Sequence, residues 1–193
     1  SRGLGDVYKR QVEEGVSKSP KEITWQQLSN FLHGGAGVNF LCRQHGFKLV
    51  LVDAGVDYDL PYEKGIINCS VGRGTRSFLH APAMSHEEME LCLERGAQMV
   101  DKAYADGCNV ISFGEMGIGN TTPSSALVSV LLNLPANEVT GRGAGLSGDG
   151  LDRKIHAIKK AIAVNRPDPK DAIDVLAKVG GFDIAGMAGM FLG

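Results

Sequence analysis

The chain has 193 residues, enough for one domain with its own core, and 43% of them are hydrophobic, as in an ordinary globular protein. Acidic and basic residues are interspersed to a net charge of -2, so no basic face predicts nucleic acid as a partner. No apolar run approaches the roughly 20 residues that a membrane-spanning helix needs, and residues 1–16 lack the apolar core of a secretory signal. The four cysteines form no C-x-x-C pair, which argues against a zinc knuckle or a disulfide scaffold. We therefore expect a cytoplasmic protein with reduced thiols.

Hydrophobic periodicity predicts a helix followed by a strand in the first third of the chain. Ser19 is expected to be the N-cap of a helix over 20–32, which resumes after two glycines and runs to about residue 42. Residues 47–53 (FKLVLVD) are an apolar run typical of a strand buried on both faces. A short strand is expected near 66–71, within a stretch that otherwise reads as loop.

Helices and strands continue to alternate after this loop. Ser85 and Glu88 form the pattern of a capping box, which opens a helix that runs to about Ala105. Residues 108–113 (CNVISF) are expected to form the next strand. The remaining predicted elements are a helix over 123–132, a glycine loop over 141–146, and helices over 149–165, 168–179 and 182–193. This order predicts an α/β protein, a Rossmann-like three-layer fold with a mostly parallel sheet and helices on both faces. Ligands of such folds bind beyond the carboxyl ends of the strands.

The stretch FGEMGIGNTTP stands between the strand over 108–113 and the helix that follows. The bare amides of Gly117 and Gly119, together with the helix N-terminus, are typical of an anion site. Thr121 and Thr122 can cap the helix or donate to a phosphate. Glu115 would then suit ribose hydroxyls or a positive charge that develops on a sugar. The stretch is neither a Walker A loop nor a dinucleotide fingerprint, and a tight turn without ligand is the alternative.

Other charged residues are weaker candidates. Lys154 can be read as a solvated position on its helix, and Asp53 and Asp57 can serve turn hydrogen bonds at the end of their strand. The histidines show no ligand spacing, since HEEME lacks the second histidine of a zincin, so we expect no metal. Three arginines are candidate phosphate contacts: Arg73, Arg76 and Arg142.

Five long motifs resemble one enzyme family in order and spacing, from about Val12 to Gly193. They are EEGVSKSPKEITWQQ, RGTRSFLHAPAMS, GEMGIGNTTP, GRGAGLSGDGLDRK and DVLAKVGGFDIAGMAG. The chain resembles the nicotinate-nucleotide:dimethylbenzimidazole phosphoribosyltransferases, pentosyltransferases of cobalamin (vitamin B12) nucleotide-loop assembly. The resemblance implies transfer of the phosphoribosyl group of nicotinate mononucleotide to 5,6-dimethylbenzimidazole, giving α-ribazole 5'-phosphate and nicotinate. It also implies a homodimer, and we expect no cofactor.

The resemblance also implies roles for individual residues. Glu115 matches the functionally important acid of the family's nucleotide-binding loop, to which Gly117, Gly119, Asn120 and Thr121 also belong. Lys154 matches the lysine on the phosphate side. Two residues match the lining of the base pocket: Ser19 and Gln27.

Two segments depart from the family pattern. The family's catalytic carboxylate follows in a GEG context, and no GEG follows Lys154 in this sequence. Glu115 is therefore expected to be a supporting acid and not the base that takes the proton of the benzimidazole. Residues 1–11 match neither the strand nor the turn that precedes EEGVS in the family, so we expect them to be non-native and 12–193 to be one partial domain, truncated at both ends. We expect such a chain to bind nucleotide weakly and to turn over poorly.

Two readings from other classes stay open at this point. One is a non-catalytic α/β module that binds a phosphorylated metabolite. The other is an oxidoreductase that binds a dinucleotide, against which the broken glycine fingerprint argues.

Overall fold

A computed structural model describes residues 2–6, 15–143 and 145–193 of the chain. Within them one parallel sheet has the strand order β3-β2-β1-β4. Its strands are β1 (Arg2–Asp6), β2 (Val50–Gly55), β3 (Ile66–Asn68) and β4 (Phe113–Met116). The predicted α/β class and parallel sheet are confirmed.

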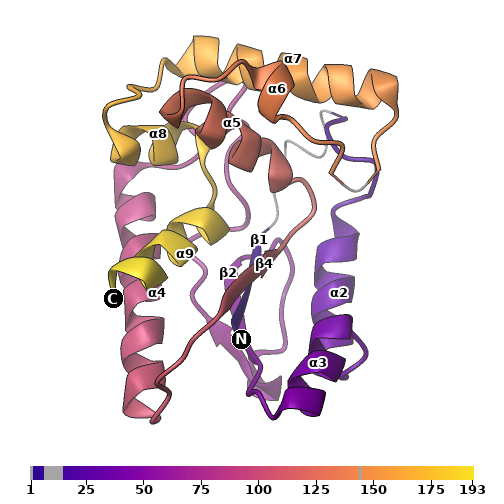
Figure 1. The fold of residues 1–193 in the computed structure, drawn as a ribbon, viewed down its shortest axis with the longest axis vertical. Helices are drawn as coiled ribbons and strands as arrows, with labels where there is room; N and C mark the ends of the chain where they lie inside the picture. Colours follow the sequence, from indigo (N-terminus) through magenta and orange to yellow (C-terminus); the bar gives the residue numbers. More distant parts are fainter. Residues whose placement is uncertain (1, 7–14, 144) are drawn as a thin grey trace.

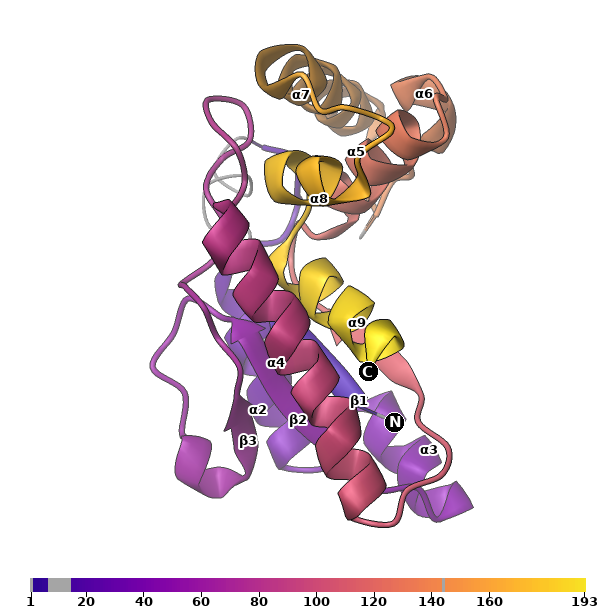
Figure 2. The same ribbon diagram turned by 90° about the vertical axis from the view of Figure 1, so that its left-hand side faces the viewer.

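Helices cover both faces of this sheet, and a further group of helices lies beyond the carboxyl ends of its strands (Figures 1 and 2). One face carries α2 (Glu22–Leu32) and α3 (Gly37–His45), and the other carries α4 (His86–Ala105) and α9 (Phe182–Leu192). The group beyond the strands consists of α5 (Thr121–Leu131), α6 (Ala136–Val139), α7 (Gly148–Asn165) and α8 (Ala172–Val179). A short 3-10 turn, η1 (Tyr62–Lys64), precedes β3.

Local signals placed some helix ends correctly and others wrongly. The capping box of α4 is confirmed, since Ser85 Oγ accepts from Glu88 N at 3.1 Å and Glu88 Oε2 accepts from Ser85 N at 2.6 Å. Ser19 is not the N-cap of α2, because the carbonyls of residues 20 and 21 already accept from residues 23 and 24 and the helix begins later, after Lys21. Helix α8 likewise begins at Ala172, because the Asp171 side chain accepts the first amides of the helix. Helix α6 was not predicted.

One strand prediction needs correction, and one strand lies in a segment for which no strand was predicted. The strand expected over 108–113 lies at Phe113–Met116, because β1 pairs with it only from Phe113 onward. Arg2–Asp6, within the segment expected to be non-native, form a central strand although their sequence favours no strand. Residues 7–11, and residue 144 of the second glycine loop, lie outside the described residues. That the first segment is non-native stays a prediction.

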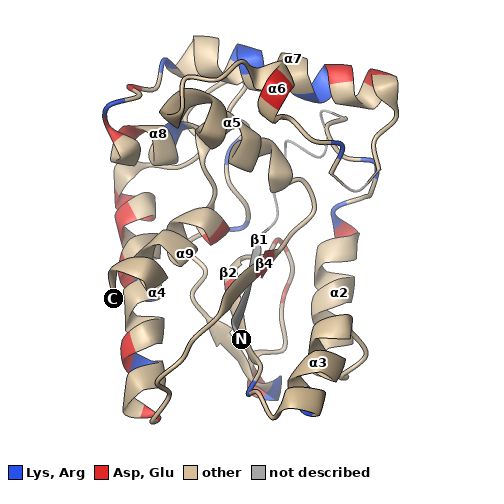
Figure 3. Ribbon diagram, in the orientation of Figure 1, with Lys and Arg blue, Asp and Glu red and all other residues tan. Residues whose placement is uncertain are grey.

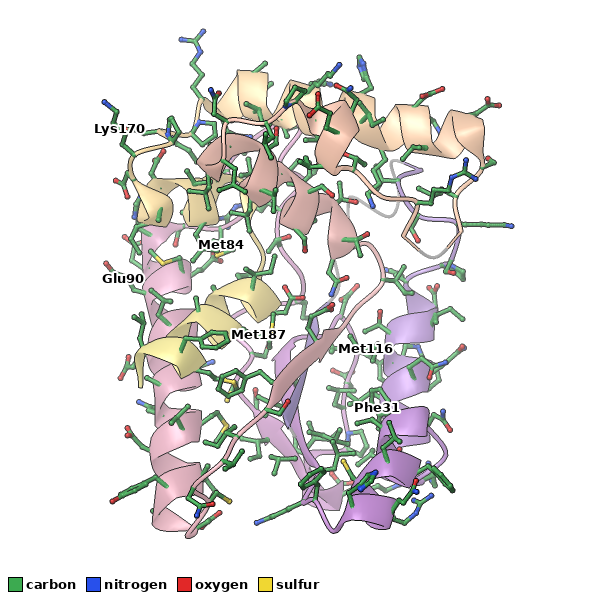
Figure 4. All side chains as sticks on the ribbon, viewed as in Figure 1. Phe31, Met84, Glu90, Met116, Lys170 and Met187 are labelled. Atoms are coloured by element: carbon green, nitrogen blue, oxygen red, sulfur yellow. The ribbon has the colours of Figure 1, made fainter. Side chains whose placement is uncertain are left out.

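Apolar side chains fill the space on each side of the sheet. A small cluster of Leu28, Leu51, Val56 and Ile66 lies toward α2, with Phe31 and Met116 packed against it. Figure 4 shows Phe31 and Met116 in this layer and Met187, on α9, across the sheet. The larger cluster joins α4, α9 and the helices beyond the strands, and its largest fully buried side chains include Phe78, Met84, Met89 and Phe182.

Helices α4 and α9 touch backbone to backbone. A Cβ added to Gly96 of α4 would overlap the carbonyl oxygen of Gly186 in α9, and one added to Gly189 would overlap the carbonyl oxygen of Leu93. Glycine is therefore required at these two positions to let the helices approach. This contact fixes the place of α9, whose first turn carries a buried acid, Asp183.

We expect Gly96→Ala to lower the free energy of unfolding by about 2–3 kcal/mol, because the methyl group meets rigid backbone and forces the two helices apart. Gly37→Ala is the matched control, since Gly37 begins α3 and its Cβ would enter open space. Urea unfolding of both variants and of the parent chain measures the difference. An equal stability of the two variants would contradict the close packing of α4 and α9.

Candidate functional site

The glycine loop between β4 and α5 is held in place by α2. Ile118 N donates to Thr24 Oγ1 at 3.1 Å, and Thr24 is completely buried on α2. Gly119 adopts φ +91°, a left-handed conformation that glycine tolerates and other residues rarely adopt. The loop therefore has a defined shape at the carboxyl edge of the sheet, where ligands of such folds bind.

Five predicted residues line one open pocket: Gly117, Gly119, Asn120, Thr121 and Lys154. The second glycine loop contributes Arg142 and Gly143, and the segment before α2 contributes Ser17 and Lys18. The pocket thus gathers three cationic side chains beside the N-terminus of α5. This charge and the loop amides suit an anion such as a phosphate group.

Lys154 is buried with only 1% of its surface exposed. Its Nζ donates to Thr121 Oγ1 at 2.8 Å and to the carbonyl oxygen of Gly141 at 3.2 Å. No carboxylate of the described residues forms an ion pair with it. An ammonium group has three N–H donors, so one remains for a ligand. Burial lowers the pKa of Lys154, because removal from water disfavours the charge, and a bound anion would restore it.

Gly143 leaves space beside the Lys154 ammonium group because it has no side chain. A Cβ at Gly143 would lie 3.1 Å from Thr121 Oγ1 and 3.6 Å from Lys154 Nζ, and Gly143 has φ +53°. Thr122, by contrast, is fully buried and does not line the pocket, and its Oγ1 has no hydrogen-bond partner among the described residues. Of the two threonines, Thr121 is the one placed to meet a ligand.

An acidic cluster adjoins the pocket. The Nδ2 of Asn120 donates to Glu115 and also, at 2.9 Å, to Oδ2 of Asp183. Asp183 is fully buried, and its Oδ1 accepts from Ile184 N at 2.8 Å. Figure 3 shows acidic positions of β4 and of the start of α9 close together. Asp183 was missed in the sequence, although it is the only charged residue of an otherwise apolar helix.

The carboxyl group of Glu115 holds its proton more tightly than a free glutamate does. Partial burial, the larger cause, and repulsion from Asp183, the smaller cause, together raise the pKa of Glu115 from 4.5 to about 7. The residue as a whole remains exposed, so a ligand can reach it. Glu115 can therefore change its charge near neutral pH.

Three predicted residues do not line this pocket: Glu115, which adjoins it through Asn120, and the two residues expected in the base pocket. Ser19 is half-buried before α2, where its backbone amide donates to Ser17 Oγ at 3.2 Å. Gln27 is exposed on α2. Their role in a base pocket stays a prediction. Ser17 and Lys18, which the sequence did not single out, line the pocket instead.

Asp53 serves the turn that ends β2. Its Oδ1 accepts from Gly55 N at 2.9 Å and Val56 N at 2.7 Å, and its Oδ2 accepts from the hydroxyl of Tyr62 at 2.7 Å. Two effects raise the pKa of the Tyr62 hydroxyl: burial is the larger, and its hydrogen bond with the Asp53 carboxylate is the next. The turn-forming interpretation of Asp53 therefore fits the structure.

Most other charged candidates are engaged in pairs outside the pocket. These pairs are Asp57 with Lys21, Arg73 with Asp59, and Arg76 with Glu88. Of the three candidate arginines, only Arg142 lines the pocket. In the described ranges, no group of three or more His, Cys, Asp and Glu side chains could hold a metal ion. None of the helices there has the length and apolar character to cross a membrane.

Comparisons with known proteins agree on one family. The family model DBI_PRT, described as phosphoribosyltransferase, matches residues 11–193. The nicotinate-nucleotide–dimethylbenzimidazole phosphoribosyltransferase of Phocaeicola vulgatus is 66% identical over 173 residues, which are 90% of this chain and 50% of that protein. Its namesake from Bacteroides fragilis is 54% identical over 181 residues, 94% of this chain and 52% of the relative.

A solved structure shares the fold. The crystal structure of CobT from Thermus thermophilus superimposes with a TM-score of 0.93 at 38% identity, and the match covers 99% of this chain and 57% of that one. The chain thus spans about half the length of the curated relatives that it matches.

We expect Lys154→Met to abolish most of the stabilisation by inorganic phosphate, with the phosphate affinity reduced about 10- to 100-fold, as for loss of a charged hydrogen bond. The thermal midpoint without phosphate should be retained or raised, because the variant buries no charge. Lys160→Met, at an exposed position of α7, is the control. Thermal unfolding across a phosphate series measures both effects, and an equal phosphate response of the two variants would contradict the anion site.

We expect Glu115→Gln to become more stable than the parent as pH rises from about 4.5 through about 7, with no further gain above that range. The folded state holds the Glu115 proton more tightly than the unfolded state, so ionisation of Glu115 costs stability across this window. Glu90→Gln, at an exposed position of α4, is the matched control. Urea unfolding at a series of pH values measures the difference, and parallel curves for the parent and Glu115→Gln would exclude Glu115 as the titrating group.

Proposed function

The chain belongs to the phosphoribosyltransferase family, and on this premise we propose that it serves phosphoribosyl transfer from nicotinate mononucleotide to 5,6-dimethylbenzimidazole. The products are α-ribazole 5'-phosphate and nicotinate, in assembly of the cobalamin nucleotide loop. The names of the close relatives support these substrates.

One observation carries the proposal. Successive residues of the glycine loop connect a cationic pocket to an acidic cluster, since Thr121 accepts from Lys154 and Asn120 donates to Glu115 and Asp183. A ribose 5-phosphate has the same polarity, with an anionic phosphate at one end and an anomeric carbon that becomes positive at the other. The phosphate is assigned to Lys154 and the loop amides, and the ribose is assigned to Glu115.

The chemistry of the transfer suits these assignments. The bond between the anomeric carbon and the pyridinium nitrogen breaks through an oxocarbenium-like sugar, and nicotinate leaves with the electron pair and without a proton. Ionised Glu115 would stabilise the positive charge on the sugar. A nitrogen of the benzimidazole then bonds to the anomeric carbon, and the ring proton of the benzimidazole passes to a base. The resemblance assigns that base to a GEG segment, which does not follow Lys154 in this sequence.

The cellular setting belongs to the same proposal. We assign the protein to the cytoplasm, supported by cysteines that stand apart without a disulfide pattern. A homodimer is supported by exposed apolar residues at the end of α9, where Phe191 and Leu192 are each 78% exposed. Equilibrium sedimentation tests the dimer.

We expect excess nicotinate mononucleotide to raise the thermal midpoint of the chain by a few °C and excess NAD to leave it unchanged. The mononucleotide offers a terminal phosphate to the cationic pocket, whereas the corresponding phosphate of NAD is part of a pyrophosphate. Lys154→Met and Glu115→Ala should lose the rise, whereas Lys160→Met should keep it.

Release of nicotinate by the chain alone should be slow or absent. A chain that binds the mononucleotide but never turns over, even when the C-terminal part of the relatives is supplied, would favour the alternative, a non-catalytic module for a phosphorylated metabolite. A midpoint that ignores the mononucleotide would overturn the proposed function for this chain.

A further inference from the structure

Asp183 has a place in the site that no feature of the pocket itself explains. It lies in the first turn of α9, is fully buried, and does not line the pocket. One of its oxygens accepts from Ile184 N of its own helix, which fits an acid at a helix N-terminus. The other oxygen accepts from the amide nitrogen of Asn120 in the glycine loop. The buried carboxylate of Asp183 is thus fixed on α9 and faces the glycine loop between β4 and α5.

Asn120 connects this carboxylate to Glu115. Its side-chain nitrogen carries two hydrogens, so it can donate one to Asp183 and the other to Glu115. The opposite orientation would point the amide oxygen at two carboxylates and is excluded by repulsion. Asn120 is 4% exposed and has little room to turn. The two acids therefore define the orientation of the amide, and the amide defines the position of the Glu115 carboxyl group.

We propose that Asp183 is a positioning residue for Glu115, which it holds through the side-chain amide of Asn120. The part that Glu115 plays in a reaction rests on the proposed function, whereas its positioning by Asp183 can be measured without substrate. Asp183 itself touches no ligand in this arrangement. Its negative charge favours the protonated form of Glu115, and its hydrogen bond holds the donor that Glu115 uses when it is ionised.

Several described charged side chains around the acidic cluster are engaged elsewhere, and Lys18 and Arg142 line the neighbouring pocket. Lys154 of α7 donates to Thr121 and Gly141, and Asp53 of β2 accepts from Tyr62. Lys21, next to α2, pairs with Asp57. Helix α5 carries no charged residue, and β4 carries none besides Glu115. Among the described side chains, Asp183 is the charged group that acts on Glu115.

This arrangement makes the protonation state of Glu115 depend on whether a cationic ligand is bound. A cationic pyridinium or a developing positive charge on a ribose favours the ionised carboxylate, against the effect of Asp183. Binding of such a ligand should therefore release the Glu115 proton, whereas binding of phosphate alone should not. Asp183 would in this way make the ionisation of Glu115 depend on the positive charge of the ribose.

The test is a titration of Glu115 in the 193-residue chain by NMR of its side-chain carboxyl carbon, without ligand. The parent chain should titrate near pH 7. Asp183→Asn should lower the midpoint by about one pH unit or less, because the like charge is removed while burial remains. Asp174→Asn is the matched control, the same change in the first turn of α8, and it should leave the midpoint unchanged. An unaltered midpoint in a cooperatively folded Asp183→Asn chain would overturn the proposal.

A second variant and a measurement on the parent decide the matter if Asp183→Asn does not fold. Asn120→Leu keeps the volume of the side chain and removes the donor, so it should raise the Glu115 midpoint, opposite to Asp183→Asn. In the parent chain the two side-chain amide protons of Asn120 should exchange slowly and shift with the Glu115 titration. Amide signals that exchange quickly and ignore this titration would also overturn the proposal.

Adding nicotinate mononucleotide separates this inference from the proposed function. If the Glu115 midpoint changes with Asp183 but the mononucleotide does not bind, the positioning stands and the proposed function fails. If the mononucleotide binds and the midpoint is the same in Asp183→Asn, the proposed function stands and the positioning fails. If both hold, binding should lower the Glu115 midpoint in the parent chain.

Discussion

The contact between α4 and α9 determines where the acidic cluster of this protein lies. At Gly96 and Gly189 the two helices meet through backbone atoms, so their separation is set by van der Waals contact between rigid backbones and not by adjustable side chains. This fixed contact places the N-terminus of α9 beside the loop that follows β4. Asp183 is consequently buried next to Asn120, although 63 residues separate the two in sequence. The position of the acidic cluster thus depends on glycines at positions 96 and 189, which lie outside the cluster itself.

The site itself consists of two charged groups of opposite sign, held apart by two neighbouring residues. Lys154 brings a buried positive charge without a carboxylate partner among the described residues, and Glu115 with Asp183 brings negative charge. Collapse of these groups into an ion pair would satisfy both and leave nothing for a ligand. Thr121 and Asn120 prevent that collapse, because each binds one of the two groups and the rigid backbone between them keeps the groups separate. The protein therefore retains unsatisfied electrostatic interactions in its folded state, as expected for a binding site and not for a stabilising salt bridge.

Local sequence signals predicted features that depend on neighbouring residues alone. The capping box at Ser85 and the glycine loop after β4 depend on spacings of a few residues. The capping box is confirmed, and the loop lines a pocket together with cationic side chains, whereas anion binding there stays a prediction. The strand placed at 108–113 was wrong because its register depends on β1, a distant partner whose sequence favours no strand. Asp183 escaped notice for the same reason, since an acid in a helical first turn is ordinary until a distant amide is placed against it. Contacts between residues far apart in the chain could not be predicted from the sequence.

The hydrogen bond from Ile118 to Thr24 has a consequence for how the site would evolve. It connects the middle of the glycine loop to a completely buried side chain of α2, so the loop is ordered before any ligand arrives. The conformational entropy that a mobile loop would lose on binding has then already been lost on folding. Fold stability and the affinity of the proposed site would consequently share one interaction, so that selection on either quantity would act on the other. Substitutions in the buried face of α2, which contact no ligand, are therefore a route by which related proteins can tune affinity while every residue of the pocket stays the same.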